Sequence, residues 1–464
     1  MVKFNAYTSE EIISDLRQHV TATAVHSDVT TLKAHENDQY GVQLASGLPL
    51  AYIEATSAAD VQGVLQTARR FHIAIVPETT ATSTVSGSDA IAGSFVLSLA
   101  KMNRIKEINP VDQIAIVEPG VINGDLDKAA RAQGLFYAPD PGSKPISSIG
   151  GNVSTNAGGM STVRYGATKD SVLGLTVILA DGRELKLGGR SLKQAFGYDL
   201  TQLFVGSEGT LGIITEISVR LFPIPLGGAI TGQAFFKDMG ALADAVAKLR
   251  GSGAYPAMLE ALDAPTVAAL DRYEGTYYAE NSGAMLILRL DSYNDLILAT
   301  TKQILEENGA QNLALTTDAT QAAQIMKLRR DMLPAVFANG QHVMEDMAVP
   351  LSKLAEMIDY IQQIATQLDL TIYTAGHAGD GNVHPTIVWP ADEPEVPATV
   401  ITALQLMFRK ALALGGTISG EHAVGLLKNQ WNNEELGPEV DLVQHQIKAL
   451  FDPMNLLNPQ RKIN

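Results

Sequence analysis

A proline-rich connection just before the middle of the chain, Leu221-Phe222-Pro223-Ile224-Pro225, constrains the fold more than any other feature. Two prolines this close together cannot continue a helix or take part in a central strand, and glycines follow at 227 and 228. The chain has 464 residues, which is too long for one ordinary hydrophobic core. We therefore expect two or three lobes, with the main boundary at this connection.

The two sides of the connection carry different secondary-structure patterns. Residues 50–55 and 73–76 predict strands on either side of an amphipathic helix at 58–71, a β-α-β order typical of an α/β unit. Beyond the connection, helices such as 354–368 alternate with strands such as 284–290, the pattern of a lobe with an antiparallel sheet. Further elements are expected as helices at 9–17 (with Ser9 as N-cap), 123–133 and 241–249, and as strands at 95–99, 114–120 and 172–179. The fold class is therefore α+β.

Composition excludes several classes of partner and cofactor. A formal net charge of −16 and a pI near 5.0 argue against nucleic acid or an anionic membrane surface as a partner. The chain has no cysteine, which excludes disulfides, iron–sulfur clusters, thiolate zinc sites and a cysteinyl flavin link. No uninterrupted apolar run reaches about eighteen residues, and the first residues lack the apolar stretch of an export signal. We therefore expect a cytoplasmic protein without a transmembrane segment.

Two glycine-rich motifs carry the strongest signal for chemistry, namely the segment from Gly376 to His384 and Ser419-Gly420-Glu421-His422. His377 and His384 are seven residues apart, and in a straight strand this odd offset would place them on opposite faces. The glycines around Asp380, which we interpret as a turn residue, can bend the chain so that both imidazoles converge. Glu421 and His422 are expected where a glycine-rich strand end meets a helix. Three imidazoles and a carboxylate are enough to bind a divalent metal and still leave one imidazole free to act as a base. The alternative for His377 and His384 is that they are structural histidines held by hydrogen bonds.

Other motifs narrow the class of cofactor. No G-x-G-x-x-G follows a predicted strand and no G-x-x-x-x-G-K-[ST] occurs, so the sequence supports neither a Rossmann dinucleotide site nor a P-loop. The glycine- and serine-rich passage from Ser147 to Gly159 lacks bulky side chains, so its backbone amides can approach a flat or anionic ligand. Arg329 and Arg330 follow an amphipathic stretch. A guanidinium is a natural two-point partner of a carboxylate, but most such arginine pairs are surface charges.

These motifs, in this order, resemble one family over nearly the whole chain. The resemblance rests on Pro139-Asp140-Pro141, Ser148–Asn152, Asn156–Gly159, Arg164-Tyr165-Gly166, Val205–Gly212, the two histidine motifs, and the tail with Phe451-Asp452-Pro453 and Leu457-Asn458-Pro459. The family is that of the FAD-dependent D-2-hydroxy acid dehydrogenases of the vanillyl-alcohol oxidase superfamily, which includes D-lactate dehydrogenase, the glycolate oxidase flavin subunit and D-2-hydroxyglutarate dehydrogenase. It implies an FAD-binding domain of two α/β subdomains at 1–222 and a substrate domain at 223–420, whose antiparallel sheet is flanked by helices. A C-terminal segment at 421–464 would close on the FAD-binding domain.

The resemblance also assigns site residues. His377, His384 and Glu421 match the metal ligands of the family, His422 matches its catalytic base, and Arg329 matches the arginine that binds the substrate carboxylate. FAD, bound non-covalently, would contact Pro77, Thr79, Thr80, Ala81, Thr82, Ser83, Pro141, Ser148, Gly150, Gly151, Asn152, Asn156, Ala157, Gly158, Gly159, Tyr165, Gly166, Glu208, Gly209, Gly212, Ile213, Ile214 and Asn458.

One loop departs from the family pattern. The first phosphate loop of the family is rich in glycine and begins Pro-Arg-Gly, whereas here Pro77 is followed by Glu78 and by no glycine before Gly87. Each non-glycine residue held at positive φ would cost roughly 1 to 3 kcal/mol, and Glu78 would repel a pyrophosphate if it faced one. Either the loop takes a different path and its hydroxyls donate to phosphate, which we favour, or FAD is held loosely. The loop contains no His, Cys or Tyr, so we expect no covalent flavin link from it.

The expected reaction is oxidation of a small D-2-hydroxy acid, D-lactate or glycolate, to the 2-oxo acid with FAD. Arg329 would bind the carboxylate, a zinc, manganese or iron ion would bind the hydroxyl, and His422 would remove the hydroxyl proton. Electrons would then pass to an external acceptor such as a quinone, a cytochrome or an electron-transfer protein. The alternatives are D-2-hydroxyglutarate as substrate, a flavin-poor accessory subunit that acts through protein contacts, and a metal-dependent hydrolase that uses the same histidines. A homodimer is compatible with the sequence.

Overall fold

The computed structural model describes residues 7–38, 47–393 and 395–463, and the described chain forms two compact units. Residues 1–6, on which the expectation of no export signal partly rests, lie outside the described residues. The first unit is Met1–Gly158, Gly166–Ile224 and Glu421–Asn464, and the second is Gly159–Tyr165 and Pro225–Gly420. The second unit thus includes a short segment, 159–165, from within the predicted FAD-binding domain.

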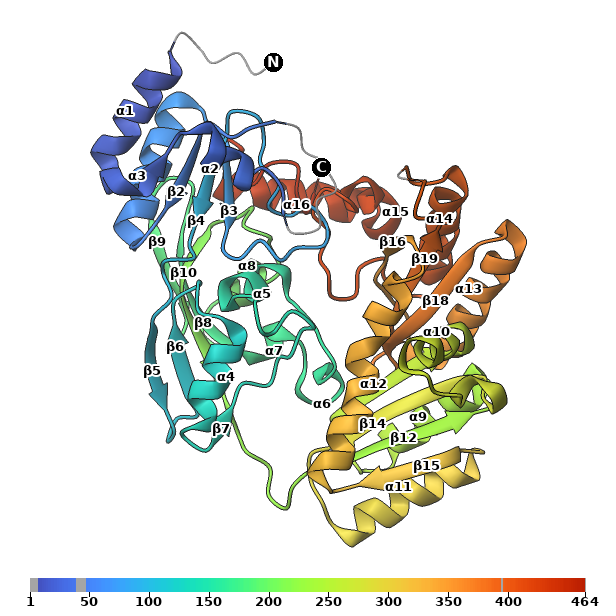
Figure 1. Cartoon of the computed structure of the whole chain (residues 1–464). Coiled ribbons are helices and arrows are strands. Elements are labelled where there is room, and N and C mark those ends of the chain that lie inside the picture. The colour runs from blue at the N-terminus through green and yellow to red at the C-terminus, as the bar shows by residue number, and fades with distance from the viewer. Residues whose placement is uncertain (1–6, 39–46, 394, 464) are drawn as a thin grey trace. The chain divides into compact units, whose positions relative to one another are not determined.

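The first unit begins with a four-stranded sheet in the order β1-β2-β4-β3, in which β2, β4 and β3 are parallel and β1 is antiparallel to β2 (Figure 1). Its elements are α1 (Ser9–His19), β1 (Val25–His26), α2 (Val29–Ala34), β2 (Ala51–Glu54), α3 (Ala58–Phe71), β3 (Ile75–Glu78) and β4 (Phe95–Ser98). Apolar residues of α1 and α3 share one core with the sheet, which confirms the predicted β-α-β order. The predicted N-cap Ser9 is wrong, because the Thr8 hydroxyl accepts from the Glu11 amide and the Glu11 carboxylate accepts from the Thr8 amide.

A five-stranded antiparallel sheet, in the order β5-β6-β10-β8-β9, forms the second part of this unit. Its strands are β5 (Ile105–Asn109), β6 (Ile114–Val117), β8 (Val172–Ile178), β9 (Glu184–Gly188) and β10 (Ile213–Arg220), and a small ribbon pairs β7 (Leu135–Phe136) with β11 (Phe222–Pro223). Its helices are α4 (Asn123–Arg131), α5 (Ile149–Thr155), α7 (Thr168–Ser171) and α8 (Leu200–Phe204). α4, α5 and α8 share one apolar core with the sheet.

The C-terminal segment returns to the first sheet of the same unit. It contains α15 (Asn432–Leu436) and α16 (Pro438–Phe451). Leu457 then forms a parallel bridge with Ile75 of β3, in which Ile75 N donates to Leu456 O and Asn458 N donates to Ile75 O. The end of the chain therefore lies beside the strand that leads into the glycine-poor loop.

The second unit is built on an eight-stranded antiparallel sheet in the order β15-β12-β14-β13-β18-β19-β16, with β17 also paired to β19. The strands are β12 (Ile230–Phe236), β13 (Met258–Asp263), β14 (Ala284–Leu290), β15 (Gln311–Thr316), β16 (Gln341–Met344), β17 (Met347–Ala348), β18 (Thr371–His377) and β19 (Asn382–Trp389). The helices are α6 (Thr162–Tyr165), α9 (Met239–Gly251), α10 (Ala264–Glu274), α11 (Asp295–Glu307), α12 (Ala319–Phe337), α13 (Leu354–Leu368) and α14 (Ala398–Ala413). This confirms the predicted antiparallel sheet flanked by helices.

Helices α10 and α12 cover one face of this sheet, where their apolar side chains pack on Phe235, Met258 and Ile287 (Figure 1). α9 packs against α11 and α13, and α13 packs against α14. Short 3₁₀ helices occur at Ala22–Ala24, Tyr278–Asn281, Leu351–Lys353 and Asn429–Trp431. Within the described ranges, each helix is too short or too polar to cross a bilayer.

Candidate active site

The β18–β19 hairpin brings His377 and His384 together on one face of the second unit's sheet. β18 ends at His377, β19 begins at Asn382, and Gly381 completes the turn with φ of +87°, a conformation that side chains rarely adopt. His384 lies opposite Ala375, two residues before His377, so both imidazoles project from the same face. Their ring centroids are 5.2 Å apart. The predicted convergence is therefore confirmed, and it arises because the two residues lie on neighbouring strands.

A buried carboxylate, Glu260, holds the first of these imidazoles. Glu260 on β13 lies directly opposite His377 on β18, and its Oε1 is 2.6 Å from His377 Nδ1. Its other oxygen accepts a hydrogen bond from Nε of Arg329 on α12, also at 2.6 Å. Burial raises the pKa of Glu260, but the charges and hydrogen bonds of His377 and Arg329 outweigh burial and lower this pKa to about 2. Because Glu260 occupies Nδ1, the ring of His377 presents Nε2 to a ligand.

The two adjacent arginines of α12 differ in burial. Arg329 is half-buried, whereas Arg330 is exposed. Only the first of the two is therefore anchored inside the second unit, which is where the resemblance places the carboxylate-binding arginine.

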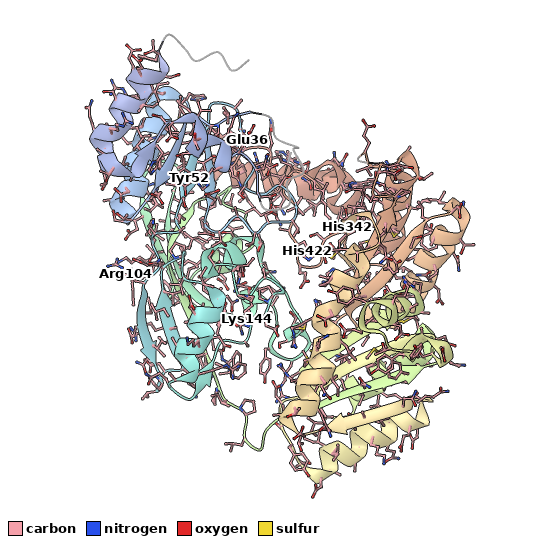
Figure 2. All side chains as sticks on the ribbon, in the orientation of Figure 1. Glu36, Tyr52, Arg104, Lys144, His342 and His422 are labelled. Atoms are coloured by element: carbon pink, nitrogen blue, oxygen red, sulfur yellow. The ribbon has the colours of Figure 1, made fainter. Side chains whose placement is uncertain are left out.

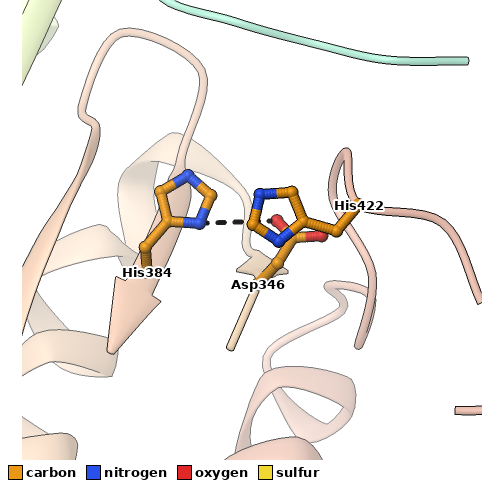
Figure 3. Close-up of side chains that lie close together, drawn as sticks. All are labelled: Asp346, His384 and His422. Carbon is orange, nitrogen blue, oxygen red and sulfur yellow. Dashed lines mark ion pairs between the residues drawn. The ribbon is translucent and has the colours of Figure 1, made fainter. Parts of the chain in front are cut away.

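A second buried carboxylate lies beside His384. β16 and β17 both pair with β19, and Glu345 and Asp346 interrupt these two strands opposite His384. Asp346 is fully buried, and its Oδ1 is 3.8 Å from His384 Nδ1, the ion pair drawn in Figure 3. Each imidazole of the hairpin thus has a carboxylate next to its Nδ1, an arrangement that orients histidine ligands toward a metal.

Glu421 and His422 directly follow Gly420, the last residue of the second unit. Thr417, just before them, forms a bridge with β17, and the hydroxyl of Ser419 donates to Asp346 Oδ2 at 3.4 Å. The chain therefore leaves the second unit at the edge that carries Asp346. The predicted helix after His422 is wrong, because the segment continues as a loop to the 3₁₀ turn at Asn429–Trp431.

Two groups of side chains at this edge could each offer three ligand atoms to a metal ion. Within each group the ligand atoms lie within 4.8 Å of one another. One group is His377, His384 and Glu421, and the other, drawn in Figure 3, is Asp346, His384 and His422. The first group is the predicted ligand set, and two imidazoles with a carboxylate suit zinc, manganese or iron. These donors fit a divalent cation.

Glu260 and Asp346 are absent from the residues predicted from the sequence, although a signal for both is present. Glu260 is a single carboxylate inside the apolar strand 257–262, and Asp346 belongs to two adjacent acids within the otherwise apolar run 343–349. A carboxylate buried in such a run costs free energy unless it is paired. A charged residue in the middle of an apolar strand therefore indicates a partner elsewhere in the chain.

In the first unit, the predicted FAD-binding segments meet near the carboxyl end of β3. The hydroxyl oxygens of Thr79, just after β3, and Ser148, the N-cap of α5, are 2.5 Å apart. The side-chain amide of Asn458 donates to the carbonyls of Gly87 and Glu208 at 3.2 and 2.8 Å. The glycine-poor loop, the passage before α5, the turn before β10 and the C-terminal tail are thus tied together within this unit.

Two buried polar atoms in this group fit a nucleotide cofactor. Asn152 Nδ2 and Asn458 Oδ1 are both buried, and neither has a hydrogen-bond partner in the part of the chain that the structure describes. Buried donors and acceptors are normally satisfied, and FAD offers both kinds of partner. The remaining predicted contacts lie in β3 (Pro77), the loop after it (Thr79 to Ser83), the loop before α5 (Pro141), α5 and the loop after it (Gly150 to Gly159), Gly166, and the turn into β10 (Gly209 to Ile214).

Some of these predicted residues also have partners within the protein. A Cβ atom on Gly150 would lie 2.8 Å from the Pro119 carbonyl, so the close packing of α5 itself requires glycine there. The Tyr165 hydroxyl donates to Asp291 Oδ2 at 2.7 Å inside the second unit, and burial together with this bond raises the pKa of Tyr165. A contact of Tyr165 with FAD stays a prediction.

The carboxylate of Glu78, at the start of the glycine-poor loop, is buried and paired. Glu78 Oε1 is 3.0 Å from His35 Nδ1. The ring of His35 stacks on Tyr52, labelled in Figure 2, with centroids 3.6 Å apart. The Glu78 carboxylate is thus paired with the imidazole of the residue that directly follows α2.

Hydroxyl groups shape the rest of this loop. Ser83 Oγ accepts hydrogen bonds from the amides of Val85 and Gly87 at 3.2 and 3.1 Å. Positive φ occurs at Ala81 (50°) and Ser86 (56°), so two non-glycine residues of this loop adopt the left-handed conformation, which is costly for residues with a side chain.

Glu208, predicted as an FAD contact, has a further role in the structure. Its carboxylate accepts hydrogen bonds from the amides of Val424 and Gly425 at 3.0 and 2.7 Å, and Lys462 Nζ lies 3.5 Å away. These bonds fix the loop that immediately follows His422 to the turn before β10.

Comparison with known proteins identifies the family. A model of the FAD binding domain matches residues 49–188, and one described as FAD linked oxidases, C-terminal domain, matches residues 229–461. The chain is 36% identical to glycolate oxidase subunit GlcD of Bacillus subtilis (strain 168) over 416 residues, 89% of this chain and 88% of the relative. It is 34% identical to D-lactate dehydrogenase of Anaerostipes hadrus, with 89% of each covered.

Solved structures show the same fold. Substrate-bound p-cresol methylhydroxylase matches with a TM-score of 0.80 at 18% identity, covering 98% of this chain and 97% of that one. 4-Ethylphenol oxidase from Gulosibacter chungangensis matches with a TM-score of 0.77 at 18% identity, covering 99% and 98%. At this identity the likeness concerns the fold alone, and the fold is of the vanillyl-alcohol oxidase type. The chain therefore belongs to the family of FAD-linked oxidases, and it is an FAD-dependent oxidoreductase.

Proposed function

We propose that this protein oxidises a small D-2-hydroxy acid, with D-lactate and glycolate as the leading candidates, to the corresponding 2-oxo acid. The observation that carries the proposal is the pairing of Arg329 with the imidazole cluster through Glu260. A cation suited to a carboxylate is thereby joined to a group of donors suited to a metal that binds a hydroxyl. The names of the relatives, glycolate oxidase subunit and D-lactate dehydrogenase, agree with this class of substrate.

Each residue has a distinct role in the proposed reaction. Arg329 binds the substrate carboxylate through its terminal nitrogens, because Glu260 takes the Nε–H. His377, His384 and Glu421 would hold a divalent ion, which would supply Lewis acidity to the substrate hydroxyl. His422 accepts the hydroxyl proton, a general-base role typically worth about 10² to 10⁴ in rate. FAD, when bound, would supply the hydride acceptor that oxidation of the C2–H bond requires, and its electrons would pass to an acceptor outside the chain.

His384→Ala tests the metal. The variant should bind a divalent ion at least about 100-fold more weakly and lose turnover, because a direct ligand matters more than the outer-shell groups whose loss already costs 10- to 100-fold. His342→Ala is the matched control, because His342, labelled in Figure 2, lies on β16 in the same sheet. It stacks on Phe337 and belongs to neither ligand group. Metal analysis and steady-state turnover give the answer. Retention of both in His384→Ala would remove the metal from the mechanism.

The substrate and the base need separate measurements. D- and L-2-hydroxy acids are added anaerobically to the purified protein, and bleaching of the flavin absorbance identifies the substrate. D-2-hydroxyglutarate belongs in the same screen as the alternative substrate. In His422→Ala the rate of flavin reduction in a single turnover should fall by about 10² to 10⁴, and an unchanged rate would exclude His422 as the base.

Two other functions give different results in these assays. A flavin-poor accessory subunit would be purified without the yellow absorbance of FAD. A metal-dependent hydrolase would release product without an electron acceptor.

A further inference from the structure

We propose that Glu260 is a positioning residue that fixes the separation between the carboxylate-binding arginine and the metal, and thereby selects 2-hydroxy acids over acids with the hydroxyl further from the carboxylate. The inference rests on the proposed function, which assigns Arg329 and His377 their roles. Glu260 contacts neither substrate nor metal in this proposal and acts through these two residues.

Glu260, which connects Arg329 to His377, lies on a rigid part of the backbone. Glu260 lies in β13, which is paired on one side with β14 and on the other with β18, so its backbone is fixed from both edges. The side chain is 1% exposed, and each of its two oxygens makes a contact of 2.6 Å. A short hydrogen bond at each end of one carboxylate leaves little freedom to Arg329 or to His377.

The chemistry of the two contacts is complementary. His377 donates Nδ1–H to the carboxylate, which fixes the tautomer, raises the basicity of the ring and directs Nε2 toward a metal. Arg329 donates Nε–H, so a substrate carboxylate meets the two terminal nitrogens of the planar guanidinium. One three-atom group, Oε1–Cδ–Oε2, therefore sets the spacing between carboxylate recognition and hydroxyl recognition.

This spacing has a consequence for selectivity. In a 2-hydroxy acid the hydroxyl-bearing carbon is bonded directly to the carboxylate carbon, whereas a 3-hydroxy acid inserts one more carbon. If the distance between Arg329 and the metal is fixed, a 2-hydroxy acid can place its carboxylate on the arginine and its hydroxyl on the metal at the same time. A 3-hydroxy acid can place only one of these two groups correctly. Burial of a charged carboxylate at the centre of a strand is unfavourable unless it is fully paired, and here both partners are residues that the proposed reaction uses.

Glu260→Gln is the direct test. The amide keeps the shape but has one acceptor oxygen, so its NH₂ group must face either the Nδ1–H of His377 or the Nε–H of Arg329. Zn²⁺ alone is titrated into the full-length, FAD-loaded protein, previously stripped of metal, against a chromophoric chelator. We expect the Kd for Zn²⁺ to rise about 10- to 100-fold. The ratio of kcat/KM for D-lactate to that for D-3-hydroxybutyrate should fall about tenfold or more.

Asp263→Asn is the matched control. Asp263 lies three residues further along the same strand, is also a buried carboxylate, and its oxygens bond to Thr266, Gln362 and Thr374 rather than to His377 or Arg329. It should change stability but leave the Kd for Zn²⁺ and the selectivity ratio within about twofold. An equal rise of the Kd in both variants would mean general loosening of the sheet and would overturn the inference.

A double-mutant cycle separates coupling from local damage. Arg329→Lys should weaken Zn²⁺ binding in the parent, because it removes the bond that holds Glu260, and should have little effect on Zn²⁺ binding in the Glu260→Gln background. A folded Glu260→Gln protein with unchanged Kd and unchanged selectivity overturns this inference alone. A parent protein that binds no Zn²⁺ overturns the metal part of the proposed function, and this inference with it.

Discussion

Lys448, a buried lysine of α16, tests how the C-terminal tail holds the predicted FAD-binding segments. It is 9% exposed, and its Nζ donates to Thr210 O at 2.8 Å, to Leu457 O at 2.8 Å and to Asp452 Oδ2 at 2.5 Å. Lys448→Met keeps most of the length of the side chain, removes all three hydrogen bonds and leaves the Asp452 carboxylate buried without its cation. Removing one partner of a buried ion pair costs about 3 to 5 kcal/mol, and we adopt this range because the three bonds form one network and do not add independently.

The two tryptophans allow each unit to be followed separately. Trp431 lies in the first unit and Trp389 in the second, so urea unfolding of a Trp389→Phe background, detected by fluorescence, reports on the first unit. Lys448→Met should lower its unfolding free energy by about 3 to 5 kcal/mol and should release FAD on dialysis, since Leu457 precedes the predicted FAD contact Asn458. Lys186→Met, with a side chain 81% exposed in the same unit, should stay within about 0.5 kcal/mol. A loss below about 1 kcal/mol for Lys448→Met, or equal losses for both variants, would refute the reasoning.

Three further predictions concern stability. Ala81→Gly, at φ +50°, should raise the unfolding free energy of the first unit by up to about 1 kcal/mol, whereas Ala132→Gly, at φ −64°, should lower it; the same urea assay decides. Burial raises the pKa of Asp263 to about 6, so the folded form binds this proton more tightly than the unfolded form, and stability should fall as pH rises from about 4 through 6. Asp263→Asn should remove about 3 kcal/mol of this dependence, measured by unfolding of the second unit across that range, and an identical slope in both proteins would contradict the assignment. Tyr165→Phe removes the hydrogen bond to Asp291 and should lower the unfolding free energy of the second unit by about 1.5 to 3 kcal/mol. An unchanged unfolding free energy would contradict this prediction.

Elements with a strong local pattern could be predicted from the sequence almost to the residue. The strand Ala284–Leu290 and the helix Leu354–Leu368 have the predicted bounds, because a continuous apolar run and an apolar face of helical period each leave few alternatives. The turn at Asp380 could also be predicted from its immediate neighbours, since two glycines flank it. By contrast, α5 lies within a passage whose glycines lower helix propensity. Ile149 and Val153, both fully buried, stabilise it by packing that no local pattern reveals.

The candidate site shows the same division between local and distant information. His377 and His384 could be paired from the sequence because only a hairpin turn separates them. Glu260 lies 117 residues before His377, and their contact depends on the register of β13 against β18, which the periodicity of either strand leaves undetermined. The sequence pattern offered Arg329 and Arg330 together as possible partners of a carboxylate, and only the resemblance selected Arg329, since its helical neighbours do not distinguish the two.

The charge balance around the hairpin imidazoles gives an electrostatic argument for the proposed divalent ion, in addition to its Lewis acidity. Glu260 and Asp346 are buried acids beside the hairpin imidazoles, and Glu421, which directly follows the last residue of the second unit, is a further acid in one of the two ligand groups. A 2-hydroxy acid would add another negative charge to this group of carboxylates. Arg329 is a permanent cation, but Glu260 already neutralises much of its charge at 2.6 Å. A divalent ion on the imidazole nitrogens would supply the remaining positive charge, so that an anionic substrate is attracted to a set of residues that would otherwise repel it.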